Sequence, residues 1–231
     1  MDSLREELLS EIPIVQNWIF VAFLFCLFLS LPALSKGGRT ISSMFQSLFK
    51  NDTKDSLFLE SAKNELVSKI LLILQSIILF SIIAYSVIKT HTYIEINEVN
   101  KLHSIILWLG LFGLSFIMTK LILYNIFNNI FFRKEDVAIW NETFSSILSL
   151  SGLILFIPTL IMFFEEKAYI YCLIFIVTYL IGSILLTFYK IYSTFFYRKG
   201  LLLYFILYLC TLEIMPLYWA YKAFSFLFIS M

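Results

Sequence analysis

Charged residues are scarce in this chain, and their scarcity excludes most soluble folds. They make up 14% of the 231 residues, against 60% hydrophobic residues, and the mean hydropathy is +0.88. An ordinary soluble domain carries roughly 25% charged and about 45–50% apolar residues. The two signs nearly balance at a net charge of +1, so the basic footprint of a nucleic-acid-binding protein is also missing. We therefore expect a membrane protein that binds no nucleic acid.

Short motifs that mark other classes of protein are absent as well. The three cysteines, Cys26, Cys172 and Cys210, all lie within apolar runs and form no CxxC motif. The sequence contains no nucleophile elbow, zinc-protease helix, P-loop or dinucleotide fingerprint. Residues 1–16 are acidic, unlike the basic start of a cleaved signal peptide. We accordingly expect no metal and no cofactor, and we expect the first apolar run to remain in the mature protein.

Long apolar runs recur along the chain, and each can cross a bilayer as a helix. A span needs about 20 apolar residues to cross roughly 30 Å of hydrocarbon. The runs are continuously apolar rather than alternating, which favours helices over a membrane barrel. The sequence thus predicts one all-α domain over residues 1–231, a polytopic transmembrane bundle of about six spanning helices. The predicted spans lie at about 17–35, 66–88, 104–127, 143–164, 168–190 and 201–224.

Basic residues are distributed unevenly between the two sides of these spans. The connections after the first, third and fifth spans, with the span ends beside them, hold eleven Lys and Arg residues, and the opposite side holds five. Basic residues near span ends stay in the cytoplasm. The bias therefore predicts that both termini lie outside.

The longest connection contains an amphipathic stretch at about 39–50. Its apolar residues recur at the spacing of one helix face: Ile41, Met44, Phe45, Leu48 and Phe49. Such a helix would lie in the cytoplasmic headgroup layer, with Arg39 and Lys50 near anionic lipid. Packing of the same stripe on neighbouring spans is an equal alternative.

Two ionisable residues lie deep within the predicted spans, Lys120 in the third and Glu213 in the last. A charge near the bilayer centre costs roughly 2.5–3.5 kcal/mol on insertion scales, so such a residue usually faces the protein interior and has a partner. The helical rise places the two backbones about 6–12 Å apart in depth. A direct pair therefore remains open, because Lys120 can instead reach toward the cytoplasmic headgroups.

The neighbours of Lys120 share its helix face. Gly113, Tyr124 and Asn128 lie seven before, four after and eight after it. A small and polar stripe of this kind is typical of a hydrogen-bonded helix interface and equally of a narrow hydrated cavity. Gln75, near the middle of the second span, is expected to make an interhelical hydrogen bond.

Glu213 lies where the helix backbone is interrupted. Pro216 follows it by three residues and leaves a carbonyl one turn earlier without its amide partner. Irregular backbone beside an ionisable group recurs in ion and proton pathways. The structural alternative is a protonated or lysine-paired glutamate that locks the bundle.

The last span also carries a pattern that resembles a known family. Tyr-Leu-Cys, then Glu-Ile and then Pro stand at Tyr208, Leu209, Cys210, Glu213, Ile214 and Pro216. The pattern is similar to the ending of an uncharacterised inner-membrane family from Bacteroidota that is catalogued as a domain of unknown function. The resemblance implies the bacterial inner (cytoplasmic) membrane, and it implies no activity. In that membrane the bias in basic residues would put both termini in the periplasm. The candidate intramembrane polar site then comprises Lys120, Tyr124, Tyr208, Cys210, Glu213 and Pro216.

Three functions fit this sequence, and the lipid bilayer is a partner in all of them. The leading hypothesis is a non-enzymatic protein that assembles with a second copy or with another protein of the cell envelope. The alternative is a small proton- or ion-coupled transporter or channel that uses Glu213 and Lys120, although we find no inverted repeat of the transporter kind. A membrane enzyme acting on lipid-linked substrates, with Glu213 as acid or base, is the least favoured.

Overall fold

The chain is helical throughout the regular elements that the structure describes. The computed structural model describes residues 2–35, 41–42, 44–45, 48, 59–91, 99–132, 134–196, 208, 210–216, 218–219 and 222. Its long helices are α1 (Asp2–Ser35), α3 (Leu59–His91), α4 (Val99–Phe131), α5 (Lys134–Ile154), α6 (Phe156–Phe164) and α7 (Tyr169–Ile191). Short helical turns are η1 (Glu166–Ala168), η2 (Tyr192–Phe196) and η3 (Cys210–Ile214). The expected all-α fold is confirmed.

Five described segments are long and apolar enough to cross a membrane. They are Trp18–Ser35, Leu66–Ile88, Ile105–Asn128, Asp136–Phe164 and Tyr169–Thr194. Helices suit this environment because every backbone polar group inside the helix is satisfied without water. These segments coincide with the first five predicted spans. The predicted sixth span, 201–224, falls largely outside the described residues and stays a prediction.

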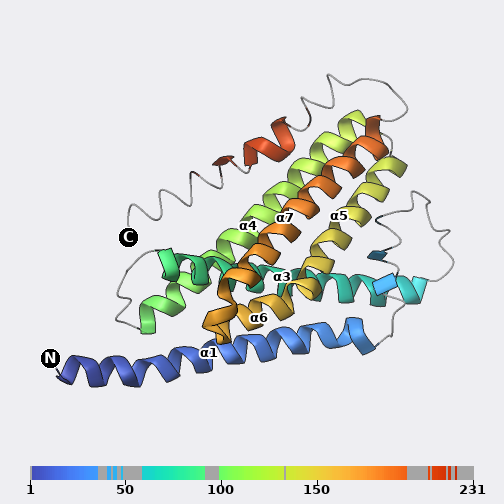
Figure 1. Cartoon of the computed structure of the whole chain (residues 1–231). Coiled ribbons are helices and arrows are strands. Elements are labelled where there is room, and N and C mark those ends of the chain that lie inside the picture. Colours follow the sequence, from blue (N-terminus) through green and yellow to red (C-terminus); the bar gives the residue numbers. More distant parts are fainter. Residues whose placement is uncertain are drawn as a thin grey trace.

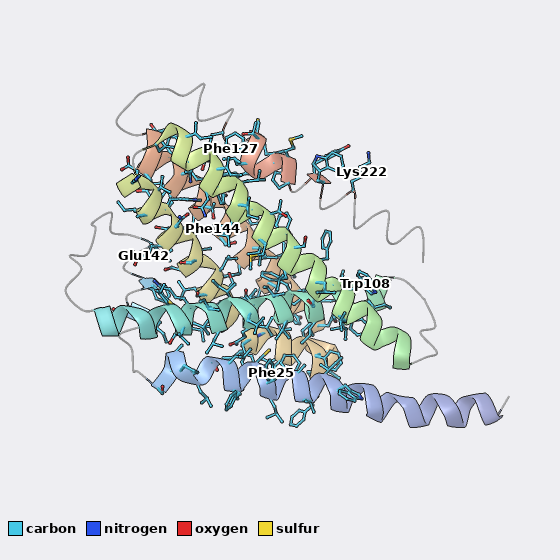
Figure 2. All side chains as sticks on the ribbon, turned by 180° about the vertical axis from the view of Figure 1, so that it is seen from behind. Phe25, Trp108, Phe127, Glu142, Phe144 and Lys222 are labelled. Atoms are coloured by element: carbon cyan, nitrogen blue, oxygen red, sulfur yellow. The ribbon has the colours of Figure 1, made fainter. Side chains whose placement is uncertain are left out.

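The outer surface of the bundle is apolar, as lipid requires. Figure 2 shows large side chains projecting away from the helices, among them Phe25 and Trp108. Trp108 on α4 is 62% exposed and Tyr171 on α7 is 76% exposed. In water such an extensive apolar surface would cause the protein to aggregate. Against hydrocarbon it is the ordinary exterior of a spanning helix.

α3 and α4 run in opposite directions. A Cβ atom on Gly110 would lie 3.5 Å from Ser81 Oγ, and one on Gly113 would lie 3.7 Å from Ile77 Cγ2. From Gly110 to Gly113 the residue number on α4 rises, while that of the contacting residue on α3 falls from 81 to 77. The two helices are therefore antiparallel. Successive membrane crossings require this change of direction.

α3 and α5 instead point in the same general direction and cross at very close range. Ser149 Oγ donates to the Lys69 carbonyl at 3.2 Å, and Gln75 Nε2 donates to the Gly152 carbonyl at 2.9 Å. A Cβ atom on Gly152 would lie only 2.5 Å from the carbonyl oxygen of Leu72. Small residues permit such close approach between membrane helices. The interhelical hydrogen bond predicted for Gln75 is therefore confirmed, and the second and fourth spans point the same way, as alternating crossings demand.

The fourth span is interrupted near its C-terminal end and starts earlier than the hydropathy indicated. Pro158 has no amide hydrogen to donate to the carbonyl of Ile154, and the helix is interrupted for one residue, Leu155, between α5 and α6. Helical hydrogen bonds continue on both sides, because Leu155 N–H donates to the Ser151 carbonyl and Thr159 N–H donates to the Leu155 carbonyl, each at 3.0 Å. At its other end α5 begins at Lys134 rather than near 143. Polar residues lower the hydropathy over this extra stretch, but the helical hydrogen bonding continues through it.

Part of the amphipathic connection packs against the spans. Met44 and Leu48 are buried in one cluster with Ala33, Leu72 and Ile147, whereas Phe45 is exposed. For these residues the packing alternative holds. Much of 39–50 lies outside the described residues, and its placement in the headgroup layer stays a prediction.

The arrangement brings α4 and the C-terminal segment together. In Figure 1, α1 and α3 run side by side, and α4, α5 and α7 rise obliquely from them. The segment around η3 lies against the upper part of α4. This contact positions the two charges singled out in the sequence.

Candidate functional site

A polar line runs along one face of α4. Lys120, Tyr124 and Asn128 are spaced four residues apart, so each lies about 6 Å further along the helix than the last. Tyr124 and Asn128 are fully buried, and the Lys120 side chain is 13% exposed. The face that carries them is turned toward the C-terminal segment.

Glu213 is presented by an irregular turn of helix. η3 is a π-helical turn over Cys210–Ile214, and Pro216 follows it. A π-helical turn is wider than an α-helical one and commonly marks a functional or strained site. Within it Leu212 and Glu213 point inward and are 1% and 3% exposed, whereas Cys210 and Ile214 face outward. The irregular backbone thus places a carboxylate against α4.

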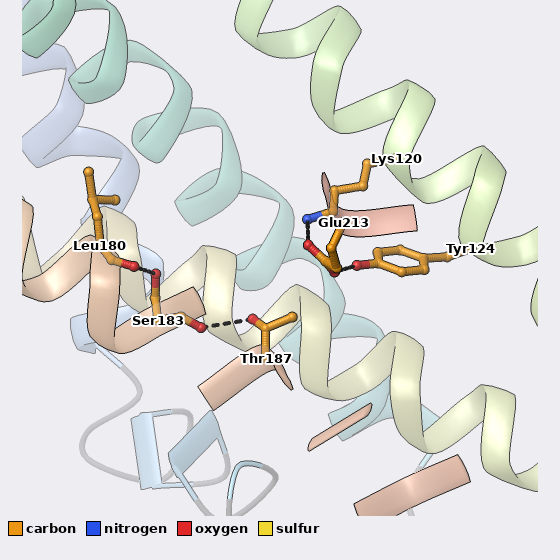
Figure 3. A network of polar contacts seen from close by, with 6 residues as sticks. All are labelled: Lys120, Tyr124, Leu180, Ser183, Thr187 and Glu213. Carbon is orange, nitrogen blue, oxygen red and sulfur yellow. Dashed lines mark hydrogen bonds and ion pairs between the residues drawn. The ribbon is translucent and has the colours of Figure 1, made fainter. Parts of the chain in front are cut away.

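Both oxygens of the Glu213 carboxylate receive a donor from α4 (Figure 3). The Lys120 ammonium lies 2.6 Å from Oε2 as an ion pair. The Tyr124 hydroxyl donates to Oε1. Two donors on adjacent turns of one helix therefore hold a single carboxylate. The pairing that the sequence left open is present.

Aromatic rings enclose this ion pair. The Lys120 ammonium lies 5.7 Å from the ring centroids of both Tyr124 and Phe144, within the range of a cation–π interaction. Tyr124 packs edge-on against Trp140 and Phe144, each at 5.2 Å, and Trp140 stacks on Phe144 at 6.1 Å. Trp140 is fully buried. Such packing excludes water and strengthens the attraction between the charges.

Two hydroxyl groups of α7 are engaged within their own helix. Ser183 Oγ donates to the Leu180 carbonyl and Thr187 Oγ1 donates to the Ser183 carbonyl, each at 2.8 Å (Figure 3). Back-bonding of this kind satisfies Ser and Thr inside membrane helices without a second partner. These two hydrogen bonds therefore stay within α7 and do not reach Glu213.

A second polar contact continues the line along α4. The Tyr208 hydroxyl donates to Asn128 Oδ1 at 2.8 Å, and the Tyr208 ring packs edge-on against Phe132. Among the described residues, Asn128 Nδ2 has no hydrogen-bond partner. Lys120 and Tyr124 reach Glu213, whereas Asn128 reaches Tyr208, so the C-terminal segment runs antiparallel to α4.

The structure gathers most, but not all, of the residues proposed from the sequence. Lys120, Tyr124 and Glu213 touch one another, and Tyr208 binds the next polar residue of α4. Cys210 is exposed and points away from the pair. Pro216 is partly buried, and its contribution is the missing backbone donor.

Sequence reasoning missed the aromatic enclosure and two buried lysines. Trp140 lies just before the predicted start of its span, and an uncharged ring gives no signal of its own. Lys69 and Lys190 were counted with the connections, yet they are 6% and 2% exposed. Lys69 lies 3.7 Å from Glu142, whose side chain is half-exposed. Both lysines lie at the ends of predicted spans, in 66–88 and 168–190, and only this position could have indicated that they are buried.

Comparison with known proteins places the chain in a family. No curated protein and no solved structure matches it. The Domain of unknown function (DUF4271) matches residues 19–224, which covers the ion pair and all five described spans except Trp18. The chain is an integral membrane protein, and it belongs to the DUF4271 family.

Proposed function

We propose that this protein is a non-enzymatic membrane component that assembles with a second copy of itself or with another protein of the cell envelope. In this proposal the Lys120–Glu213 pair fastens the chain's own helices and takes no part in chemistry. The observation that carries it is the complete engagement of the carboxylate. Both oxygens have donors from α4, and Glu213 is 3% exposed within an aromatic enclosure.

A buried carboxylate with a donor on each oxygen supports a role in holding helices together over a role in transport. A carrier of protons or ions must exchange its ligand with water on both sides of the membrane. The contacts around Glu213 instead resemble a satisfied interhelical clamp, in which each polar group has a partner from a neighbouring element.

Assembly can be tested on the full-length protein in its own membrane. Two differently tagged copies would be co-expressed, cross-linked before extraction, and then purified through one tag for native mass spectrometry. The proposal expects the second tag or one reproducible envelope protein in fixed stoichiometry. Copies mixed only after extraction serve as the control for aggregation. A strictly monomeric protein without a stoichiometric partner, with and without the cross-linker, would overturn the proposal.

One observation favours the alternative of a proton- or ion-coupled transporter. The Asn128 amide is fully buried, and its nitrogen has no partner among the described residues. It continues the polar line from Lys120 and Tyr124, and buried polar groups of this kind commonly hold an ordered water. Water beside Tyr124 would give a proton a route away from Glu213.

Reconstituted vesicles separate the two functions. Wild-type protein and Glu213→Gln would be compared for proton flux with a dye trapped inside the vesicles. The assembly proposal expects equal and background-level flux from both. A wild-type flux that Glu213→Gln abolishes would instead establish the transporter.

A further inference from the structure

The described part of the C-terminal segment, 208, 210–216, 218–219 and 222, makes polar contacts with one face of α4. Among these described residues, Tyr208, Leu212 and Glu213 are buried. Tyr208 and Leu212 belong to the aromatic cluster around Tyr124. The hydrogen bonds and ion pair described for Tyr208 and Glu213 all end on α4. Polar contacts with α4 therefore add to the apolar packing that docks the segment.

The same segment is poorly suited to enter a membrane alone. Glu213 puts a carboxylate into the apolar run, and insertion scales penalise a charge there heavily. Pro216 removes a backbone donor one turn after the carbonyl of Leu212, which hydrocarbon cannot replace. Lys120 carries the opposite charge in a helix made earlier in the chain. Pairing therefore lowers the insertion cost of the Glu213 carboxylate and that of the Lys120 ammonium together.

We propose that Lys120 and Glu213 form an insertion latch: the ammonium on α4 draws the C-terminal segment into the membrane and keeps it there. Tyr124 takes the second carboxylate oxygen, and the rings of Tyr124 and Phe144 shield the pair once it has formed. The latch is a property of the fold. It would operate in an assembly component and in a transporter alike.

The latch predicts an asymmetry between single variants. Lys120→Leu leaves Glu213 alone in the segment that must insert, so the segment should fail to enter. Glu213→Leu makes that segment more apolar, so insertion should persist without the pair. The double variant Lys120→Leu/Glu213→Leu should therefore behave like the wild type, and Lys120→Arg should too because the charge is retained.

The test is a topology measurement on the full-length chain with reporters fused to its carboxyl end. Alkaline phosphatase is active only outside the cytoplasm and a fluorescent protein only inside, so their ratio reports the side reached. Pulse-labelled chains would be assayed before degradation can select among them. Lys120→Leu is expected to shift the ratio by at least about tenfold, and Glu213→Leu and the double variant should not shift it. A wild-type ratio in Lys120→Leu, or an equal shift in all three variants, would overturn the latch.

Discussion

Replacing Lys120 with methionine removes the ammonium from the pair while it keeps the length and apolar stem of the side chain. Glu213 would then retain only the Tyr124 hydroxyl as a donor, at a position that is 3% exposed. Breaking a buried ion pair from one side typically costs about 3–5 kcal/mol, because the remaining charge is uncompensated. We expect a loss near the lower limit, about 3 kcal/mol, since Tyr124 stays in place.

The losses of stability in the complementary variants should follow a definite order. Glu213→Gln keeps the ammonium over two aromatic rings at 5.7 Å, so this variant retains a cation–π interaction of about 1–2 kcal/mol that Lys120→Met loses. Its cost should therefore be smaller than that of Lys120→Met. The double variant leaves no charge and should recover most of the stability, because neutral replacement of a buried pair is often tolerated.

Reversible unfolding in mixed detergent micelles measures these differences. Trp140 stacks within the enclosure and is one of four tryptophans, so tryptophan fluorescence reports on the site in a background where Trp18, Trp108 and Trp219 are replaced by phenylalanine. Lys167→Met, which removes an exposed lysine between α6 and α7, is the matched control and should be neutral. Strictly additive single variants, with a coupling energy below about 0.5 kcal/mol, would refute the reasoning.

Two further variants probe the packing that holds the site. Gly152→Ala should destabilise the bundle by about 1–3 kcal/mol, because the new Cβ would meet the Leu72 carbonyl oxygen at 2.5 Å. The control Gly182→Ala, where nothing lies within 4 Å, should be neutral or slightly stabilising. Equal effects of the two variants in the same unfolding assay would contradict the close crossing of α3 and α5. Tyr208→Phe should cost about 1 kcal/mol, because it leaves the buried Asn128 amide without its hydroxyl partner, and it should add independently to Gly152→Ala.

Hydropathy and charge reveal most of this architecture because lipid makes both signals strong. A helix that faces hydrocarbon must be continuously apolar, so the first five spans can be located directly. A lone charge within such a run needs a partner, and this requirement alone singles out Lys120 and Glu213 among the ionisable residues. The sixth span rests on the same reasoning alone.

The pairing itself could not be derived from the sequence. Depths counted along straight, upright helices placed Lys120 and Glu213 at different levels. α4 has 33 residues and is about 50 Å long, which exceeds the hydrocarbon thickness and permits tilting. The π-helical turn at η3 also changes the direction of Glu213, and no spacing rule predicts it. Trp140 stayed hidden because the polar residues from Lys134 onward lower the hydropathy of its helix.

The most direct test of this account is the distance between the Lys120 ammonium and the Glu213 carboxyl in a lipid bilayer. Solid-state NMR can measure it by dipolar recoupling in protein that carries nitrogen-15 at lysine Nζ and carbon-13 at the glutamate carboxyl. The 2.6 Å ion pair predicts a strong dephasing for a separation within about 4 Å, which falls to a smaller residual value in Lys120→Met and in Glu213→Gln. The Lys69–Glu142 contact contributes equally to wild type and variants. Identical dephasing in all three samples would show that the two charges do not meet in the membrane and would contradict the account.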